Sequence, residues 1–370
     1  MMISIIANFY KSEEYIPKLI DSVLGQSYDD WELVCVNDCS PGKDLEILEK
    51  YAAKDSRIRI VNNEVNLGIC KAKYRGIQEA KGTYLCFIDG DDWLERDALT
   101  KMVEPALKYD LDMVCMDSRK VLPFLGYNVP FCVDDKYKGR VIEIDTKEGE
   151  GRKNFEELYR NFFGKSLFMV TYWGKLIRKT LIEESGFTPP TNVISEDLLF
   201  TMTLFPHVKK MMFVDYLGYN WRWGGITSGK TNDFWKEKQY VVRANELYAE
   251  RLALTEKYNL PQYVSLLQIE LRNVYSSLVA AIAKEDPDTE YAKEVKMFIQ
   301  EMMKPDFYPT LSHLKNDPEY PNNQKHELLD ALINRDAERV YAYCRNIYKQ
   351  NWKKRWISKI LHAILYPFQK

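Results

Sequence analysis

Long apolar runs, net charge and clustered metal-binding residues are all scarce in this sequence, and each scarcity excludes a class of protein. No stretch approaches the roughly 20 apolar residues of a membrane-spanning helix. The opening MMISIIANFYKSEE lacks a basic segment and has too few apolar residues for a signal peptide, so we expect none. The 52 basic residues nearly balance the 54 acidic ones, which argues against a nucleic-acid partner.

Cysteine and histidine are also sparse. The seven cysteines form no CxxC pair and the four histidines are scattered, so we expect no zinc site. Reduced, buried cysteines in a cytoplasmic protein are the simplest interpretation. Aromatic residues, by contrast, make up 13% of the chain. They suit a protein that binds flat or ring-shaped ligands, although large cores also use them.

The N-terminal part of the chain alternates between two patterns. Short runs rich in β-branched and aromatic residues predict strands, and amphipathic stretches predict helices, the first of them after a Ser12 cap. This alternation predicts an α/β fold with a mostly parallel sheet covered by helices, whose ligands bind beyond the carboxyl ends of the strands. The expected strands are Ile3–Ala7, Trp31–Asn37, Ile58–Val61, Tyr84–Ile88 and Met113–Met116, and the expected helices are Tyr15–Leu24, Leu45–Tyr51, Ile69–Lys81 and Arg96–Lys108.

The rest of the chain changes character twice. From Ser118 to about Gly151, Pro, Gly, Asp and Lys recur, and we expect an extended insertion. A second structured block follows from Phe155 to Gly229. After Lys230, apolar residues recur at helical spacing and predict an α-helical C-terminal region. Its apolar stripes are Val241, Ala244, Tyr248 and Leu252, and then Leu267, Leu271, Val274, Leu278 and Ala281.

Three carboxylates follow the fourth predicted strand, in the run FIDGDDW that contains Asp89, Asp91 and Asp92. Carboxylates this close repel one another, which raises their pKa values unless a cation is present. Mg²⁺ and Mn²⁺ prefer oxygen ligands and commonly take one or two carboxylates plus substrate phosphates, so the run favours a divalent metal site. An acidic turn in which Asp92 caps the next helix is the alternative interpretation.

Asp38 follows the second predicted strand in the same way, in VCVNDCS. A carboxylate at that position can accept a hydrogen bond from a base N–H or a ribose hydroxyl. The alternative is a loop aspartate that caps the helix near Pro41.

In combination, these motifs resemble family 2 glycosyltransferases, in the expected order and over roughly the first 230 residues. The likeness runs through MISIIANFYKSEEYIPKLIDSVL, VCVNDCSPG, NLGICKAKYRG and CFIDGDDWL, and continues in WGKLIRKTLI, SEDLLF and YNWRWGGITSG. It implies an inverting GT-A-fold enzyme that moves a sugar from a UDP-sugar to a saccharide or lipid-linked acceptor in bacterial polysaccharide synthesis. Residues 1–117 would be the nucleotide-sugar-binding half of that domain, 118–229 the acceptor-binding half, 230–350 a helical region and 351–370 a basic amphipathic tail.

The resemblance also assigns roles to single residues. Asp38 would bind the uracil, Asp89 would lie near the ribose, and Asp91 would hold Mg²⁺ or Mn²⁺ together with Asp89. Ala7 stands where the family usually has a proline, Tyr10-Lys11 replaces Tyr-Asn, and Lys73-Tyr74 replaces Arg-Asn. The implied donor-binding residues are Ala7, Tyr10, Glu14, Asp38, Lys73, Asp89 and Gly90.

Glu196 and Asp197 match the acidic pair of the family, whose aspartate is the general base. Asp197 would take the proton of the acceptor hydroxyl, while the metal at Asp91 stabilises the leaving diphosphate. SEDLLF also reads as a helix start, with Ser195 as its cap and acidic residues in the first turn. Both interpretations hold if that helix presents Asp197 to the site.

Aromatic and basic residues near these motifs suggest where the acceptor binds. Sugar rings stack on tryptophan through their C–H faces, and their hydroxyls accept hydrogen bonds from arginine. We therefore expect acceptor contacts at Asp92, Trp93, Trp221 and Arg222, although packing alone would also explain both tryptophans.

The final segment, NWKKRWISKILHAILYPFQK, combines a wide apolar arc with five Lys or Arg residues and no acidic residue. As a helix it would suit an anionic membrane surface and place the protein on the inner face of the cell membrane. A helix docked on the protein's own core is the alternative. Sedimentation with anionic vesicles separates the two.

Two other functions fit parts of the sequence. A nucleotidyltransferase can share this architecture, but it would be expected to carry a glycine- and basic-rich phosphate loop after the first strand, which ANFYKSEE lacks. A catalytically silent nucleotide-binding scaffold would explain the departures at Ala7 and Lys73, whereas the presence of Asp89, Asp91 and Asp197 argues against it. Thermal stabilisation by UDP with Mn²⁺ tests for nucleotide binding.

Overall fold

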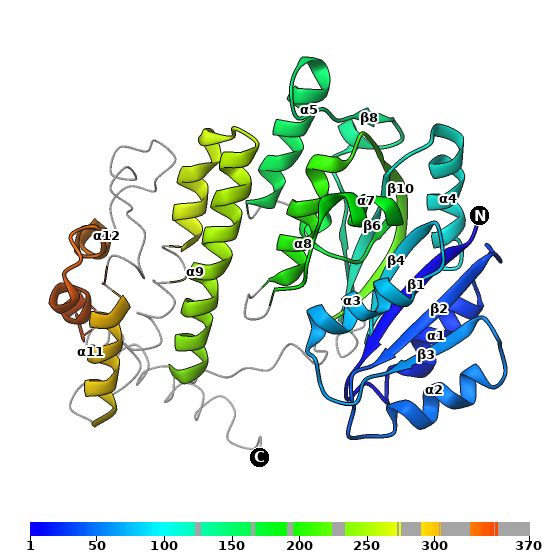
Figure 1. The fold of residues 1–370 in the computed structure, drawn as a ribbon, viewed down its shortest axis with the longest axis horizontal. Coiled ribbons are helices and arrows are strands. Elements are labelled where there is room, and N and C mark those ends of the chain that lie inside the picture. Colours follow the sequence, from blue (N-terminus) through cyan, green and yellow to red (C-terminus); the bar gives the residue numbers. More distant parts are fainter. Residues whose placement is uncertain are drawn as a thin grey trace. The chain divides into compact units, whose positions relative to one another are not determined.

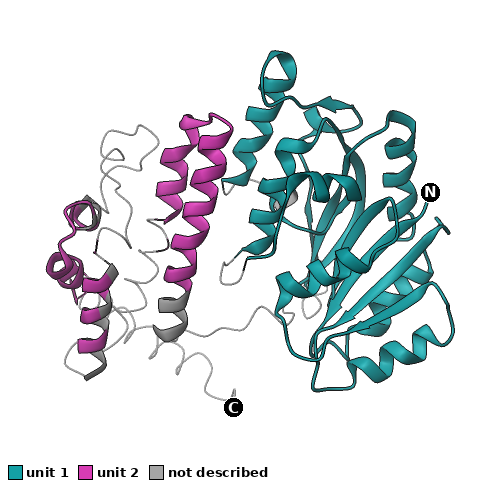
Figure 2. Ribbon diagram, in the orientation of Figure 1, with its two compact units in different colours: residues 1–191, 195–230 teal, residues 192–194, 231–370 magenta. Residues whose placement is uncertain are grey.

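The computed structural model describes residues 1–122, 127–163, 167–190, 195–223, 234–271, 274, 290–302, 304, 326–343 and 345–346. The chain divides into two compact units (Figure 2). Residues 1–191 and 195–230 form the first unit, and residues 192–194 and 231–370 form the second. Every strand that the structure describes belongs to the first unit, which therefore carries the sheet.

The first unit opens with strands that alternate with helices, as the sequence predicts (Figure 1). Its first four strands are parallel, in the spatial order β3-β2-β1-β4, so the predicted α/β fold is confirmed. Their apolar runs are buried because helices cover a parallel sheet. The strands are β1 (Ile3–Phe9), β2 (Trp31–Asn37), β3 (Ile58–Asn62) and β4 (Tyr84–Asp89), and the helices are α1 (Ile16–Leu24), α2 (Asp44–Ala52), α3 (Ile69–Glu79) and α4 (Ala98–Tyr109).

The second half of this unit extends the sheet in mixed directions. β9 (Lys175–Arg178) runs antiparallel between β4 and β6 (Met113–Leu122), and β10 (Lys210–Arg222) is parallel to β6. β5 (Trp93–Leu94) is antiparallel to β10 and ends this row of strands. The remaining elements are β7 (Tyr127–Phe131), β8 (Ile142–Glu143), α5 (Gly149–Tyr159), α6 (Leu167–Val170), α7 (Lys179–Ser185), α8 (Glu196–Leu204) and short 3-10 helices at Asp135–Tyr137, Arg160–Phe162 and Phe205–His207.

Two local predictions are wrong. The expected insertion does not start at Ser118, because residues 118–122 continue β6 and pair with both β7 and β10. Ser12 does not cap α1 with its side chain, since that helix begins at Ile16. The Ser12 carbonyl oxygen instead accepts hydrogen bonds from the N–H groups of Tyr15 and Ile16, in the turn that leads into the helix.

Alternation along β1 decides which side chains reach the ligand edge of the sheet. Ala7 and the other odd-numbered residues of the strand pack in the main core with side chains of α1 and α4. Ile6 lies on the opposite face under α3, where a Cβ on Gly76 would come within 2.5 Å of its side chain. Asn8 shares this second face and lies near the end of the strand.

The second unit is helical where the structure describes it. It contains α9 (Phe234–Lys257), a helical stretch at residues 264–271, α11 (Glu290–Met302), α12 (His326–Ile333) and a 3-10 helix at Pro261–Tyr263. Val241, Ala244 and Tyr248 are buried along one stripe of α9, which fits the predicted spacing. None of the described helices has the length and hydropathy needed to cross a membrane. The predicted membrane-binding tail, residues 351–370, lies outside the described residues.

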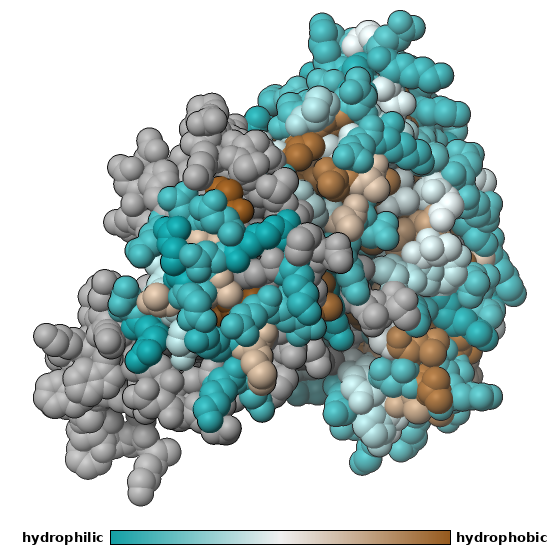
Figure 3. All heavy atoms as spheres, turned by 60° about the vertical axis from the view of Figure 1, so that its left-hand side comes forward, coloured by the Kyte–Doolittle hydropathy of each residue, from teal (hydrophilic) through white to brown (hydrophobic). Residues whose placement is uncertain are grey.

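Exposed apolar side chains are dispersed over the molecule. On the face drawn in Figure 3, hydrophobic surface gathers in separate patches among hydrophilic side chains. Among the described residues, three large exposed apolar side chains, Val65, Leu67 and Ile69, follow one another closely before and at the start of α3, whereas others such as Leu24 and Trp223 stand alone. Trp223 directly follows β10, close to the pocket described next.

Candidate functional site

A pocket of about 250 Å³ lies at the carboxyl ends of β1, β2 and β4, the edge at which open α/β sheets bind ligands. Carboxylate, amide and hydroxyl groups from these strand ends converge there with the loop before α3 and one indole ring from β10. The lining residues are Asn8, Tyr10, Ser12, Asp38, Asn66, Gly68, Ile69, Asp89, Gly90, Asp91, Asp92 and Trp221.

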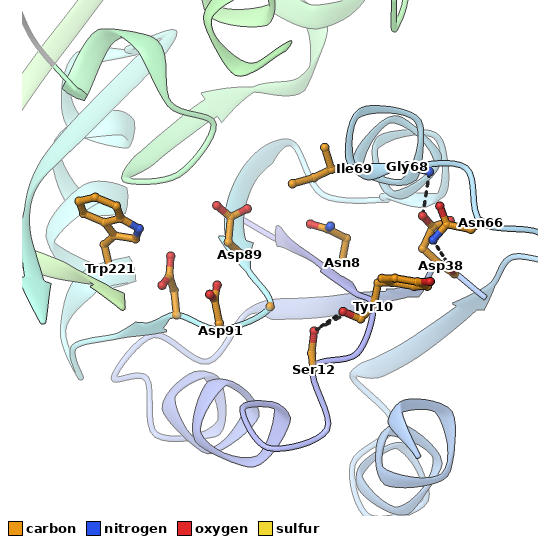
Figure 4. Close-up of a pocket in the computed structure, with 12 residues that line it drawn as sticks. Asn8, Tyr10, Ser12, Asp38, Asn66, Gly68, Ile69, Asp89, Asp91 and Trp221 are labelled. Carbon is orange, nitrogen blue, oxygen red and sulfur yellow. Dashed lines mark hydrogen bonds between the residues drawn. The ribbon is translucent and has the colours of Figure 1, made fainter. Parts of the chain in front are cut away.

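The two ends of the pocket differ in chemistry. In Figure 4, Asp38 and Trp221 lie at opposite ends, and Asp89, Asp91 and Asn8 lie between them. The fold thus brings together seven residues that the sequence singled out, although they are spread from Tyr10, just after β1, to Trp221 of β10. A ligand that fills the pocket would contact a carboxylate at one end and an indole at the other.

The carboxylate of Asp38 organises the loop that leads into α3. Its Oδ1 accepts hydrogen bonds from Asn63 Nδ2 and the Leu67 N–H, both at 2.8 Å, and its Oδ2 accepts one from the Gly68 N–H at 2.9 Å. Gly68 has a φ of +79°, a conformation that favours glycine. Because each carboxylate oxygen accepts about two hydrogen bonds, Oδ2 keeps a lone pair for a ligand. Tyr10 also lines this end of the pocket (Figure 4).

A buried ion pair joins two of the predicted donor residues. Lys73 Nζ lies 2.7 Å from Asp89 Oδ1 and 4.6 Å from the centroid of the Tyr172 ring. Burial alone lowers the pKa of Lys73, but Asp89, Glu196 and Asp197 raise it above its ordinary value. The Lys73 ammonium therefore balances part of the acidic motif, so a metal ion is not needed to explain why these carboxylates lie together.

Asp92, a predicted acceptor residue, is buried and lines the pocket. It is 1% exposed; its Oδ2 accepts from the Tyr219 hydroxyl at 2.6 Å and its Oδ1 from the Arg222 N–H at 2.8 Å. Burial, followed by the charges of Asp89 and Asp91, raises the pKa of Asp92 well above its ordinary value. The Tyr219 hydroxyl also accepts from the Asp89 N–H at 3.2 Å. Asp92 thus ties the acidic turn to β10, and it does not cap α4.

Gly90 lets the acidic turn approach β1 closely. A Cβ at Gly90 would lie 2.6 Å from the Asn8 carbonyl oxygen and 3.1 Å from Ser12 Oγ. Ala7, a predicted donor residue, is fully buried in the core, and its neighbour Asn8 lines the pocket. Glu14, another predicted donor residue, is exposed and lies outside the pocket lining.

Glu196 and Asp197 are the first residues of α8. Ser195 occupies the cap position with a φ of 52°, but its side chain makes no capping hydrogen bond. Asp197 Oδ1 accepts from the Leu198 N–H at 2.8 Å. Burial and then the charge of Glu196 raise the pKa of Asp197 to about 6, although Lys73 opposes the shift. A carboxylate of this kind is mostly ionised at neutral pH and is still basic enough to take a proton.

Tyr172 connects α8 to the acidic turn. Its ring stacks on Phe200 of α8 at a centroid distance of 4.1 Å, and it also lies beside the Lys73 ammonium. Asp197 interacts electrostatically with Lys73 and Asp89, so the start of α8 lies close to the turn. The predicted base thus lies near the Lys73–Asp89 pair, although neither Glu196 nor Asp197 is among the residues that line the pocket.

The predicted acceptor residues of β5 and β10 lie on two faces of the sheet. Trp93 pairs with Asn220 and shares a face with Arg222, whereas Trp221 points to the opposite face. Lys18 Nζ lies 3.2 Å from the centroid of the Trp93 ring, and Arg222 Cζ lies 5.3 Å from it. Arg222 Nε also donates to the Asp91 carbonyl oxygen at 2.9 Å. Arg222 thus supports the acidic turn, and of the two tryptophans only Trp221 lines the pocket.

A divalent cation at the acidic motif would need ligands from the substrate. Within the described part of the chain, no group of three or more His, Cys, Asp or Glu side chains could hold a metal ion. Asp91 lines the pocket, while Asp89 is paired with Lys73 and both oxygens of Asp92 accept hydrogen bonds. Mg²⁺ commonly binds through one or two carboxylates and substrate phosphates. The residues present therefore fit a cation that arrives with a nucleotide diphosphate.

Some residues of the site escape sequence reasoning. Asn8 can be found from strand alternation. Asn66 lies just before α3 and Ile69 is its first residue, and although both belong to the NLGICKAKYRG motif, that motif does not show that they line the pocket. Lys11 and Cys39, which adjoin the pocket residues Tyr10 and Asp38, have φ angles of 55° and 53°, which residues other than glycine rarely adopt; Asp110, Ser195, Asn259 and Arg335 also have positive φ angles.

Comparison with known proteins points to one family. The Glycosyl transferase family 2 model matches residues 4–186. The cholesterol galactosyltransferase of Borreliella burgdorferi is 29% identical over 76% of this chain and 80% of its own length. The uncharacterized glycosyltransferase EpsJ of Bacillus subtilis is 40% identical over 58% of this chain, and the match spans 59% of EpsJ.

A solved structure shares the fold. S. aureus TarS 1-349, in complex with UDP-GlcNAc, matches with a TM-score of 0.60 at 18% identity. The match covers 96% of this chain and 92% of that one.

Proposed function

The chain belongs to glycosyltransferase family 2, and on that basis we propose that it transfers a sugar from a UDP-sugar to a saccharide or lipid-linked acceptor in cell-surface polysaccharide synthesis. The pocket is the observation that supports this proposal best. One of its ends offers a carboxylate that can bind a nucleobase, and the other offers an indole that can stack on a sugar. The UDP-GlcNAc bound to TarS supports a UDP-sugar as the donor. For a lipid-linked acceptor, the basic tail at residues 351–370 would draw the enzyme to an anionic membrane surface.

The donor would lie along the pocket from Asp38 to Trp221. The free lone pair of Asp38 Oδ2 suits an N–H of uracil, as an imide donor needs an acceptor of that kind. Asp89, held by Lys73, would then face the ribose, and Asp91 would lie nearest the diphosphate. A divalent cation such as Mg²⁺ or Mn²⁺, held by Asp91 and Asp89 with the phosphates, would supply charge stabilisation for the departing UDP.

The transfer step would be a single displacement with inversion. The acceptor oxygen forms a bond to the anomeric carbon while the bond from that carbon to the diphosphate oxygen breaks, and the electron pair leaves with UDP. Asp197 would take the hydroxyl proton, and its pKa of about 6 suits this role because the carboxylate is ionised at neutral pH. Glu196, its neighbour at the start of α8, would orient the acceptor.

Turnover of nucleotide sugars tests the reaction class directly. Release of UDP from a panel of UDP-sugars, with and without Mn²⁺, should identify a donor and show metal dependence. A protein that neither hydrolyses nor binds any UDP-sugar would overturn the proposal.

Asp197→Asn tests the base. The variant should bind the donor as the wild type does but lose transfer by roughly 10²–10⁴-fold, the usual effect of removing a general base. Calorimetry measures donor affinity, and UDP release with acceptor present measures transfer. Glu183→Gln, at an exposed carboxylate of α7, is the matched control and should transfer normally. Nearly normal transfer by Asp197→Asn would mean that another group deprotonates the acceptor.

A further inference from the structure

Aromatic side chains continue from the Trp221 end of the pocket onto a face formed by β6, β7 and β10. In the sheet, Trp221 of β10 pairs with Lys120 of β6, and Phe131 of β7 pairs with Ser118 of β6. Ser118 and Lys120 are two positions apart on β6, so all four side chains lie on one face of the sheet. The Trp221 ring lies 6.2 Å from the ring of Phe131 and 5.9 Å from that of Trp223, between centroids. We call Lys120, Phe131, Trp221 and Trp223 the aromatic platform.

The aromatic platform is joined to the acidic turn by stacked rings. Trp173 stacks on Tyr219 at 4.5 Å with an interplanar angle of 8°, and it lies 6.5 Å from Trp221. The hydroxyl of Tyr219 in turn donates to Asp92. The platform is therefore held in place relative to the end of the pocket where the transferred sugar would lie.

Lys120 brings a positive charge to the aromatic platform. Its Nζ lies 3.1 Å from the centroid of the Trp223 ring and 5.2 Å from that of Trp221. It forms no ion pair with any residue that the structure describes. Lys138 provides the contrast, since its ammonium lies within 3.2 Å of the carboxylates of Asp117, Asp135 and Asp215.

We propose that the aromatic platform binds the acceptor, and that the acceptor is a sugar or polyol that carries an anionic group, a phosphate or a carboxylate. The apolar C–H face of such a ligand stacks on indole, and its anion accepts hydrogen bonds from the Lys120 ammonium. Trp221 belongs both to the platform and to the pocket lining, so the two surfaces are continuous. The inference rests on the proposed sugar transfer, because it assigns the acceptor side of that reaction.

Two observations distinguish this surface from a cluster that serves packing alone. Trp223 is 41% exposed, so its ring is not sealed in a core. The rings hold the Lys120 ammonium in place without neutralising its charge, and an ammonium held in this way remains able to bind an incoming anion.

Three probes that share one ring test the proposal: glucose 6-phosphate, glucuronic acid and glucose. Their dissociation constants are measured by ligand-observed NMR, with the donor pocket filled by UDP and Mg²⁺. The wild type should bind at least one anionic probe more tightly than glucose, and rising salt should weaken this preference. The phosphate and carboxylate probes distinguish the two kinds of anion.

Substitutions at Lys120 assign the preference to one side chain. Lys120→Gln should reduce the preference for the anionic probe about tenfold, the scale of a lost hydrogen bond to a charged group, and Lys120→Arg should restore most of it. Lys108→Gln is the matched control, because Lys108 also lies over an aromatic ring, at 4.8 Å from the Tyr109 centroid, but near the end of α4. It should keep the wild-type preference. If Lys120→Gln does not fold, Lys120→Met carries the same test, since it keeps the apolar stem over the rings.

Equal binding of all three probes by the wild type, binding of none of them, or an unchanged preference in Lys120→Gln would overturn the proposal. So would an equal loss in Lys108→Gln, because the preference would then reflect overall charge. UDP-sugar hydrolysis without acceptor separates this inference from the proposed function. If the protein hydrolyses a UDP-sugar but does not prefer the anionic probes, only the proposed acceptor subsite is contradicted. If it binds the anionic probes but no UDP, the proposed function is contradicted.

Discussion

Asp197 lies in surroundings that oppose its charge. Burial and the neighbouring Glu196 raise its pKa to about 6 from an ordinary value of 3.8. Between these two pH values the folded chain binds a proton that the unfolded chain releases, so folding becomes less favourable as the pH rises through this window. Above about pH 6 the full destabilisation is present. A carboxylate in such surroundings costs stability, and a raised pKa of this kind is what the proposed general base requires.

Asp197→Asn should therefore raise the free energy of unfolding at pH 8, because the amide is neutral and can keep the hydrogen bond from the Leu198 N–H. The gain should shrink as the pH falls through about 6 and vanish below 3.8, where the wild-type carboxyl is also neutral. Urea unfolding from pH 4 to pH 8, without nucleotide or divalent cation, measures the difference.

Asp55→Asn is a control of opposite sign. A hydrogen bond from Arg57 lowers the pKa of Asp55 in the folded chain. The ionised carboxylate therefore stabilises the folded state at pH values above the pKa that Asp55 has in the unfolded chain. This stabilisation is lost as the pH falls through the pKa that Asp55 has in the folded chain. Asp55→Asn should thus be less stable than the wild type at neutral pH. An Asp197→Asn variant that is also less stable at pH 8 would contradict the account of Asp197.

How far single residues of the site can be predicted depends on whether their partners are local. Asp38, Asp89 and Asp91 follow predicted strands, and strand ends of a parallel sheet meet at one edge, so their convergence was foreseeable. The role of Asp92 was not, because it depends on the hydroxyl of Tyr219, 127 positions later in the chain. The pairing of Lys73 with Asp89 also arises only in the folded chain.

At the scale of elements, β10 holds the acidic turn that follows β4. The Tyr219 hydroxyl donates to Asp92 and accepts from the Asp89 N–H, and the Arg222 N–H donates to the second oxygen of Asp92. The acidic turn joins β4 to β5, and β5 pairs with β10, so these bonds extend that pairing into the turn, although β9 and β6 lie between β4 and β10 in the sheet. The shape of the turn therefore depends on a distant strand.

Tyr219→Phe should weaken nucleotide binding as well as stability. Loss of the hydroxyl leaves the Asp89 N–H and one oxygen of Asp92 without a partner, which costs about 1–3 kcal/mol of stability. Because the freed groups belong to the acidic turn, the dissociation constant for UDP with Mg²⁺, measured by calorimetry, should also rise.

Tyr84→Phe is the matched control for this variant. Tyr84 is also buried and donates its hydroxyl proton to the Leu111 carbonyl oxygen, but it lies at the start of β4, away from the pocket. It should lose similar stability and bind UDP normally. Equal UDP affinity in Tyr219→Phe and the wild type would show that β10 does not position the turn.

Some strands could be predicted from the sequence and others could not, for a physical reason. β1 to β4 are short, mostly apolar runs between polar segments and are largely buried, so hydrophobicity alone identifies them in the sequence. The outer part of β6, Ser118–Leu122, mixes polar and apolar residues and becomes a strand through its pairing with β7 and β10. Long-range pairing of this kind leaves no periodic signal, which is why the segment reads as an insertion.

At the scale of the whole molecule, the first unit holds everything that the pocket requires. The described strands, the main core cluster and all the pocket-lining residues lie between Ile3 and Arg222. A chain of that length is within the usual range of a single domain. We propose that the boundary predicted near residue 230 separates a nucleotide-binding domain that folds by itself from a helical region with another task.

A chain that ends at Lys230 should accordingly unfold in one cooperative thermal transition and bind UDP with Mg²⁺ within about threefold of the full-length affinity, since a factor of three is well under 1.4 kcal/mol. Calorimetry of both chains measures this. A chain that ends at Pro190 is the control: it lacks α8 and β10, and β10 lies between β6 and β5 in the sheet, so this chain should neither fold cooperatively nor bind UDP. If the chain that ends at Lys230 aggregates or fails to bind UDP, the helical region is needed to complete the nucleotide-binding domain, and the boundary at residue 230 is wrong.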